Sequence, residues 1–328
     1  GMFKDVKGVG WYIDTFKRAQ ISINFNNYKS STIHDVFDAA CKLADERGIR
    51  VTGSELVGLI PLDAIIMAGK YYLQKQGRTI GVPESDIIES AVQSLGLNDV
   101  TPFVPKEKII EFAVGEKSGN LMSLSVDGFT NELSSNSPAP GGGSVAALAG
   151  SLGAALSSMV AALTHEKKGF ESQKTEMDVI GQDAQAIKDR LSFLVDEDTH
   201  AFNKVMAANR LLASNDEEKI MKADAVLKAN QYAIDIPFEV ATLCYTIIEL
   251  ADVLVSKGNP NSVSDAGVAA EVALAGVRGA AMNVLINLPG VDDDAYCGKK
   301  RNDVNDLIQK AEAKHKEVFD KTIGVINS

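Results

Sequence analysis

The stretch Ser137–Leu163, SPAPGGGSVAALAGSLGAALSSMVAAL, decides how the second half of this chain folds. Three glycines precede its apolar part, and no charged residue occurs between Glu132 and Glu166. An apolar run of roughly 20 residues is long enough to cross a membrane. However, alanine, serine and glycine dominate it, and few large apolar side chains are present to drive insertion. We therefore predict a buried helix whose small residues allow close approach of neighbouring helices, within one chain or across a dimer.

The sequence around this stretch predicts an all-α domain. Pro237 is expected to kink or divide one of its helices, because proline removes a backbone donor and clashes with the preceding turn. Long helices joined by short turns are typical of an antiparallel bundle. The predicted helices cover about 126–135, 143–165, 173–212, 216–257, 262–288 and 294–327.

The first third of the chain predicts a smaller α+β domain. Residues 7–13 and 18–25 predict two strands, and residues 49–61 predict a strand that enters a loop. A helix is expected between Ser31 or Thr32 and Gly48, with two more over 62–77 and 85–97. The fold class is therefore an α+β N-terminal subdomain followed by a larger all-α bundle. The expected boundaries are 1–112 for the first domain, 113–124 for a linker and 125–328 for the bundle.

Composition excludes several classes of protein. The chain has 328 residues, 45% of them hydrophobic and 23% charged, which is ordinary for a globular protein. Its net charge of −11 argues against a nucleic-acid binder, which needs a basic surface. Cys41, Cys244 and Cys297 are far apart and show no zinc-ligand spacing. With no apolar signal-peptide core near the N-terminus, we expect a cytoplasmic protein with reduced cysteines that binds neither nucleic acid nor membrane.

One acidic residue falls within an apolar helical stripe, which gives the sharpest candidate for chemistry. Spacing by three and four residues places Asp198 on that stripe, whereas Asp196 and Glu197 are expected to point elsewhere and to be solvated. A withdrawn carboxylate is costly unless it is paired or protonated, and desolvation raises its pKa. Asp198 is thus either a structural acid that bridges to another helix or a proton donor. The stripe comprises Ile187, Leu191, Leu194, Val195, Phe202, Val205 and Met206.

The glycine turn and a pair of amides are weaker candidates. Gly141, Gly142, Gly143 and Ser144 expose backbone N–H groups at a helix start, where the helix dipole favours an anion. The same glycines are also compatible with a tight turn against another helix.

Two amides lie in the apolar segment 261–288. Asn283 and Asn287 lie four residues apart and therefore on one helix face. They need polar partners, which a facing helix or a ligand ring could supply. Ser264 or Asp265 can cap the start of this helix.

Together these segments resemble the cyclodeaminase domain of the formimidoyltransferase-cyclodeaminase family. The matching motifs are SPAPGGGSVAALAGSLGAAL, LVDEDTHAF and SDAGVAAEVALAGVRGAAMNVLINL, in the same order over residues 125–328. Residues 1–112 are similar to the C-terminal subdomain of the transferase half through VKGVGWYID, AQISINF, GSELVGLIPLDA and PFVPKEKIIEF. The N-terminal subdomain, with that half's catalytic histidine, has no counterpart here, and His34 lies in a different context. We therefore expect no transferase activity.

The resemblance implies a formimidoyltetrahydrofolate cyclodeaminase, an ammonia lyase of histidine degradation and one-carbon metabolism. Its proton donor corresponds to Asp198, and we expect Gly141–Ser144, Asp265, Asn283 and Asn287 to line the folate pocket. Tetrahydrofolate is the substrate carrier, and neither a metal nor a redox cofactor is needed. The active unit is expected to be a homodimer or higher homo-oligomer, with its site at or near a subunit interface. The alternatives are a methenyltetrahydrofolate cyclohydrolase, a folate-binding scaffold without turnover, and a glutamate formimidoyltransferase.

Overall fold

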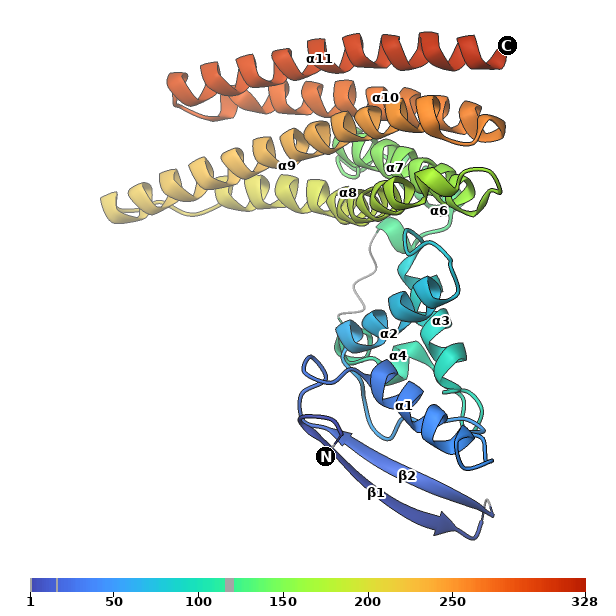
Figure 1. Ribbon diagram of the computed structural model, residues 1–328. Coiled ribbons are helices and arrows are strands. Elements are labelled where there is room, and N and C mark those ends of the chain that lie inside the picture. The colour runs from blue at the N-terminus through green and yellow to red at the C-terminus, as the bar shows by residue number, and fades with distance from the viewer. Residues whose placement is uncertain (1, 16, 116–120) are drawn as a thin grey trace. The chain divides into compact units, whose positions relative to one another are not determined.

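The computed structural model describes residues 2–15, 17–115 and 121–328 (Figure 1). The chain divides into two compact units, Gly1–Lys117 and Ser118–Ser328. Part of the expected linker, residues 116–120, lies outside the described residues. The domain boundaries 1–112, 113–124 and 125–328 therefore stay a prediction.

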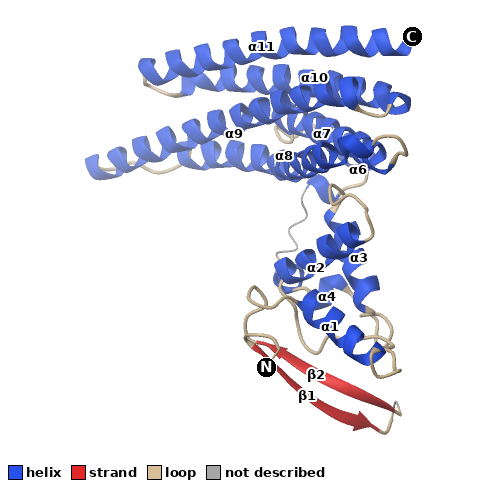
Figure 2. Cartoon of the chain, viewed as in Figure 1, coloured by secondary structure: helices blue, strands red, loops and turns tan. Residues whose placement is uncertain are grey.

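The first unit combines one small sheet with several helices, as its sequence predicts (Figure 2). Its two strands pair antiparallel, with Val6 opposite Phe25 and Ile13 opposite Arg18. The Thr32 side chain accepts a hydrogen bond from the Asp35 N–H and so fixes the start of the first helix. The elements are β1 (Val6–Ile13), β2 (Arg18–Phe25), α1 (Ile33–Asp45), α2 (Leu62–Lys75), α3 (Glu84–Leu95), α4 (Pro105–Lys108) and α5 (Ile110–Val114).

The strand predicted over residues 49–61 is wrong. Only an isolated bridge between Ile60 and Ile109 forms there. Gly53 and Gly58 have φ angles of +151° and +87°, which interrupt an extended run. The backbone and side chain of Ser54 donate to the carbonyl groups after α3 and at its end instead of to a strand.

The second unit is an all-α bundle, and the described residues 121–328 contain no strand. Its helices end within a few residues of the predicted bounds. α9 continues through Pro237 and is not divided there. The elements are α6 (Val126–Leu133), α7 (Gly142–Glu166), α8 (Lys174–Asn209), α9 (Asp216–Lys257), α10 (Val263–Asn287) and α11 (Asp294–Ile326), with short 3-10 turns at Leu121–Ser123, Glu171–Gln173, Pro260–Ser262 and Leu288–Gly290.

α7 lies in the middle of the bundle and packs against α8, α9 and α10. Its small residues bring those helices close. A Cβ added at Gly150 would lie 2.5 Å from the Cys244 Sγ and 2.9 Å from a Leu191 methyl group. One added at Gly153 would lie 2.9 Å from the Ala269 carbonyl oxygen on α10. The predicted role of these small residues within one chain is therefore confirmed.

Two segments of the described chain, Gly142–Glu166 and Pro260–Gly290, are long and apolar enough to cross a membrane by length and composition. In the bundle, 56% and 50% of their most apolar windows are buried. About half of each window therefore packs on the protein core, while the other half forms an outer surface.

Candidate active site at the start of α7

The glycine turn forms the N-terminus of α7. Gly141 is the N-cap residue, and the Ala139–Pro140 peptide bond before it is cis. The first N–H groups of a helix have no acceptor within the helix itself. Here the Ser144 backbone N–H donates to the carboxyl group of Asp198 on α8. Part of the predicted anion-binding turn is thus occupied by a carboxyl of the protein.

Asp198 and the start of α7 fit each other closely. The Ser144 Oγ lies 3.2 Å from the Asp198 Oδ2 and 2.8 Å from the Val195 carbonyl oxygen, so its single proton is shared between two acceptors. A Cβ added at Gly143 would overlap the Asp198 carboxyl group and lie 2.7 Å from Oδ2. Because any side chain at this position would displace the acid, Gly143 is needed for contact with Asp198.

The pKa of Asp198 is raised. Burial is the main cause, and the hydrogen bonds from the Ser144 side chain and backbone act in the opposite direction without cancelling it. Among the described residues no lysine, arginine or histidine forms an ion pair with this carboxyl. A half-buried acid with neutral donors only is suited to hold a proton at higher pH than a solvated aspartate.

α10 contributes the third side of this site. A Cβ added at Gly142 would lie 3.4 Å from the Asn283 Nδ2. That nitrogen donates to the Gly279 carbonyl oxygen at 2.9 Å. Gly142, Gly143, Ser144, Asp198 and Asn283 therefore converge where α7 begins, and they come from three helices.

Asn287 and Asp265, the other two predicted pocket residues, make no contact with this group in the contacts described. The Asn287 Nδ2 donates to the Ala233 carbonyl oxygen at 2.8 Å, so its partner is the facing helix α9. Asp265 lies near the opposite end of α10 from Asn283, about 27 Å away at the helical rise of about 1.5 Å per residue. Within one chain, Asp265 is therefore not part of the site around Asp198.

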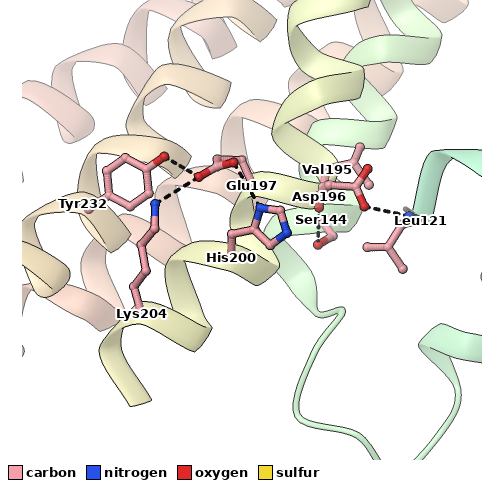
Figure 3. A network of polar contacts seen from close by, with 8 residues as sticks. All are labelled: Leu121, Ser144, Val195, Asp196, Glu197, His200, Lys204 and Tyr232. Carbon is pink, nitrogen blue, oxygen red and sulfur yellow. Dashed lines mark hydrogen bonds and ion pairs between the residues drawn. The ribbon is translucent and has the colours of Figure 1, made fainter. Parts of the chain in front are cut away.

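Glu197 is not solvated as predicted, because it is buried and only 8% exposed. It accepts a short hydrogen bond from the Tyr232 hydroxyl and lies 3.4 Å from the Lys204 Nζ and 3.2 Å from the His200 Nδ1 (Figure 3). Burial would raise its pKa, but these hydrogen bonds and the Lys204 charge outweigh burial and lower it. We call Glu197, His200, Lys204 and Tyr232 the Glu197 cluster.

Asp196 is also engaged, because its Oδ1 accepts from the Leu121 N–H at 2.6 Å (Figure 3). The three consecutive acids of α8 thus contact three different segments. Asp196 binds the turn before α6, Glu197 binds α9, and Asp198 binds α7. Together these contacts fix the rotation of α8, and hence the direction in which Asp198 points.

A finer spacing test would have found Glu197. It follows the buried Leu194 by three residues and precedes the buried Ala201 by four. The predicted stripe continued instead through Phe202 and Met206, which are both more than a third exposed. The buried face of α8 therefore shifts toward Glu197 and Ala201 beyond Val195.

Comparison with known proteins identifies the class. A family model described as formiminotransferase-cyclodeaminase matches residues 125–306, and one described as the formiminotransferase domain matches residues 1–115. Since the first match covers more than half of the chain, the chain belongs to the formiminotransferase-cyclodeaminase family.

Three particular proteins show how the similarity is distributed. Formimidoyltransferase-cyclodeaminase of Mus musculus is 36% identical over 95% of this chain and 58% of its own length. Methenyltetrahydrofolate cyclohydrolase of Methylorubrum extorquens is 35% identical over 62% of this chain and 97% of its own. The crystal structure of formiminotetrahydrofolate cyclodeaminase from Thermotoga maritima has a TM-score of 0.52 and 28% identity, covering 62% of this chain and 96% of that one. The chain thus spans about 58% of the length of the two-function relative.

Proposed function

We propose that this chain is a formimidoyltetrahydrofolate cyclodeaminase, which converts 5-formiminotetrahydrofolate to 5,10-methenyltetrahydrofolate and ammonia. The family match and the relatives' names support the substrate class. The observation that carries the proposal is the Asp198 carboxyl, withdrawn from water, raised in pKa and placed where α7, α8 and α10 meet.

The reaction needs a positioned proton donor. N10 of tetrahydrofolate attacks the formimino carbon on N5, which forms the new C–N bond and gives up the N10 proton. The imino nitrogen takes up one proton in exchange for the N10 proton and becomes an amino group. The bond from the carbon to this amino nitrogen then breaks, and the departing nitrogen takes a second proton to leave as ammonia. Asp198 supplies this proton, and its raised pKa keeps the carboxyl protonated to higher pH. Because both nitrogens belong to one substrate, holding them in position supplies much of the remaining acceleration.

The groups around Asp198 fit a ring with donors and acceptors. The turn Gly141–Ser144 offers first-turn N–H groups, and the Asn283 amide borders the same turn. We assign both to folate binding, together with Asn287 at the end of α10. Asp265 can line such a pocket only if it comes from a second subunit, because it lies at the far end of α10 in the same chain.

The remaining expectations from the family are part of this proposal. The protein acts in the cytoplasm as a homodimer or higher homo-oligomer, with its site at or near a subunit interface, and it serves histidine degradation. No metal participates in the step assigned to Asp198. Sedimentation of the purified chain, compared with its mass of 35.0 kDa, tests the oligomer.

The runner-up is a methenyltetrahydrofolate cyclohydrolase, which the match to nearly the whole Methylorubrum enzyme favours. The match of residues 1–115 to the formiminotransferase domain favours the cyclodeaminase instead. Ammonia release from 5-formiminotetrahydrofolate, with growth of the methenyl absorbance, separates the two. Hydrolysis of the methenyl compound without ammonia release from the formimino compound would establish the cyclohydrolase and reject the leading proposal.

Residues 1–112 correspond, in this proposal, to the C-terminal subdomain of a formimidoyltransferase, and they do not transfer formimino groups alone. His34 does not replace a catalytic histidine. It is buried, its ring stacks on Tyr71 at 4.3 Å, and burial lowers its pKa. Incubation with formiminoglutamate and tetrahydrofolate should give no formiminotetrahydrofolate, and formation of that product contradicts the assignment.

A further inference from the structure

The hydroxyl group of Thr199 has an unusual environment. Thr199 directly follows Asp198 on α8. Its Oγ1 atom is withdrawn from solvent and has no hydrogen-bond partner among the residues that the structure describes. A buried hydroxyl without a partner is uncommon in native proteins, because leaving it unpaired costs free energy. The position of this group beside the candidate proton donor makes its role worth tracing.

The usual acceptor of Thr199 is taken by another residue. A threonine or serine inside a helix commonly donates to the carbonyl oxygen four residues before it. For Thr199 that oxygen belongs to Val195, and it already accepts from the Ser144 Oγ at 2.8 Å (Figure 3). Helical hydroxyl groups elsewhere in this chain do bond four residues back, namely those of Thr130, Ser157, Thr164, Thr242, Thr246 and Thr322.

The Val195 carbonyl has room for one hydroxyl group at a time. A carbonyl oxygen has two lone pairs. Within the continuous helix α8, one of them accepts the backbone N–H four residues further on. The other accepts from Ser144, across the contact between α7 and α8. The hydroxyl groups of Ser144 and Thr199 therefore compete for one position, and Ser144 holds it in this structure.

Ser144 has a second acceptor, the Asp198 Oδ2 at 3.2 Å. A neutral carboxyl group is a weak acceptor, so while Asp198 is protonated the Ser144 proton stays on the shorter bond to Val195. An ionised carboxylate only accepts, and its hydrogen bonds are roughly twice as strong as those of neutral pairs. Ionisation therefore turns the Ser144 hydroxyl toward Asp198 and frees the Val195 carbonyl. Thr199 can then bond that carbonyl, because a helical threonine has two χ1 rotamers available.

We propose that the hydroxyl groups of Ser144 and Thr199 exchange places on the Val195 carbonyl when Asp198 gives up its proton. With Asp198 protonated, Ser144 bonds Val195 and Thr199 has no partner. With Asp198 ionised, Ser144 donates to the carboxylate and Thr199 replaces it on Val195. Each hydroxyl keeps its own proton, and the only proton that leaves is the one that Asp198 passes to the departing nitrogen.

Thr199 is thus a positioning residue that acts on Asp198 through Ser144. Its part in turnover rests on the proposed function, whereas the exchange of hydroxyl groups does not. Since Thr199 compensates the bond that Val195 loses, it lowers the cost of turning Ser144 toward the new carboxylate.

Other groups near Asp198 do not take over this role. On α8, Asp196 binds the turn before α6, and the Glu197 cluster, which includes the titratable group that α9 supplies, has partners of its own. The first half of α7 carries no charged residue, and α10 presents the neutral amide of Asn283 at this turn. Burial raises the pKa of Asp198, and the hydrogen bonds from Ser144 lower it.

The test measures the pH at which Asp198 titrates in the full chain. The kcat for ammonia release should fall as pH rises through the pKa of Asp198, because the donor must be protonated. Thr199→Val removes the hydroxyl with little change in shape. Val195 then loses a partner when Ser144 turns, so the ionised form is less stable and the fall in kcat should move to higher pH by about 0.5 unit.

Two controls separate the hydroxyl from its surroundings. Thr199→Ser keeps the hydroxyl and should keep the wild-type position of the fall. Thr322→Val removes another buried helical hydroxyl, which donates to the Val318 carbonyl on α11 at 2.7 Å. It should also leave the pH of the fall unchanged.

The exchange further predicts that substitutions of Ser144 and Thr199 do not add. Ser144→Ala removes the hydroxyl that turns, and should move the fall to higher pH by about 1 unit. In that background the Val195 carbonyl is open to Thr199 in both states, so Thr199→Val should have no further effect. Additive shifts in the double variant would mean that the two hydroxyl groups act independently, and would overturn the proposal.

The same titration is measurable without turnover. The difference in the free energy of unfolding between each protein and its Asp198→Asn counterpart changes with pH as Asp198 titrates, and circular dichroism confirms that each protein is folded. Thr199→Ala is the second variant should Thr199→Val not fold. If no ammonia is released but the titration moves upward in Thr199→Val and not in Thr199→Ser, the proposed function fails and the exchange stands.

Two results overturn the exchange. One is a folded Thr199→Val protein in which Asp198 titrates at the wild-type pH or below it. The other is a Thr199→Ser protein whose titration moves as far as that of Thr199→Val, since the hydroxyl would then have no part in the effect.

Discussion

The Asp198 site and the Glu197 cluster belong to neighbouring residues of α8, yet they treat a carboxyl group in opposite ways. Asp198 meets a helix N-terminus and the Ser144 hydroxyl, and its pKa is raised. Glu197 is withdrawn from solvent too, but Tyr232, His200 and Lys204 stabilise its anion, and its pKa is lowered. Burial is common to both, so the partners decide the sign of the pKa shift.

The opposite pKa shifts suggest different roles for the two acids, a structural one for Glu197 and the proposed catalytic one for Asp198. Burial, and after it the hydrogen bond to Glu197, raises the pKa of the Tyr232 hydroxyl to about 12. The same hydrogen bond connects α8 to α9. The raised pKa of Asp198 keeps its carboxyl protonated to higher pH at the first turn of α7. Glu197 thus connects two helices, whereas Asp198 is the acid to which we assign the proton transfer.

The largest expected effect is that of Asp198→Asn on turnover. Loss of a proton donor costs about 10² to 10⁴ in rate, and ammonia release from 5-formiminotetrahydrofolate measures it. Glu197→Gln is the adjacent control and should keep most of the activity. Equal loss in both variants would erase the distinction between the two acids.

The next effect is that of Gly143→Ala. The added methyl group overlaps the Asp198 carboxyl and displaces it, and a misplacement of about 1 Å costs roughly 10² in rate. Gly142→Ala is the matched control, because its methyl group makes ordinary contact with the Asn283 amide, 3.4 Å from Nδ2 and 4.0 Å from Oδ1, and does not reach Asp198. A Gly143→Ala enzyme as fast as Gly142→Ala would show that the contact has no part in turnover.

Substitutions in the Glu197 cluster should affect the stability of the protein more than its turnover. Tyr232→Phe removes the half-buried donor to the buried Glu197 and should lower the free energy of unfolding by about 1–3 kcal/mol at neutral pH. With a lowered folded-state pKa, Glu197 contributes stability above its unfolded-state pKa, and that contribution is lost as pH falls through the folded value. Urea titrations should therefore show the difference between wild type and Tyr232→Phe shrinking in acid; a gap that grows in acid would reverse the sign assigned here.

The smallest effect is that of Asp198 on stability. A raised folded-state pKa means that the folded protein binds more protons than the unfolded chain, so stability falls as pH rises from the unfolded-state pKa through the folded one. Asparagine does not ionise, so the Asp198→Asn protein should not lose stability over this pH range. It should therefore be at least as stable as wild type at neutral pH. Thermal unfolding of both proteins across this pH range is the measurement. A variant clearly less stable at neutral pH would mean that the ionised acid supports the fold.

The bundle was accessible from sequence because its signals are local. Helical spacing and the turns between helices lie within a few residues of each other, and they located every long helix of the second unit. The cap predicted at Ser264 or Asp265 is wrong, because α10 begins at Val263 with Ser262 as its N-cap residue. The same spacing selected Asp198 as the candidate acid, and its role in turnover stays a prediction. The contact between Asp198 and Gly143 could not be predicted in this way, because it joins two helices and depends on the distance between them.

The errors have a common physical origin in distant partners. Glu197 is buried because Tyr232, on another helix, satisfies it. Residues 49–61 do not form a strand because their polar groups bond near the end of α3, far along the chain. Asp265 was grouped with Asn283 by motif, whereas the length of α10 separates them. Local pattern describes each helix, but only packing between helices determines which side chains meet.

The absence of a side chain at Gly143 couples substitutions on α7 to substitutions on α8. Any residue that fills this space must displace the acid, so a substitution of Gly143 on α7 also moves the Asp198 carboxyl on α8. A double variant with Gly143→Ala and Asp198→Gly should recover the packing between α7 and α8, because the added methyl group takes the space of the removed acid. Glycine at position 143 and the acid at position 198 are thus one steric unit, in which the size of each residue limits the size of the other.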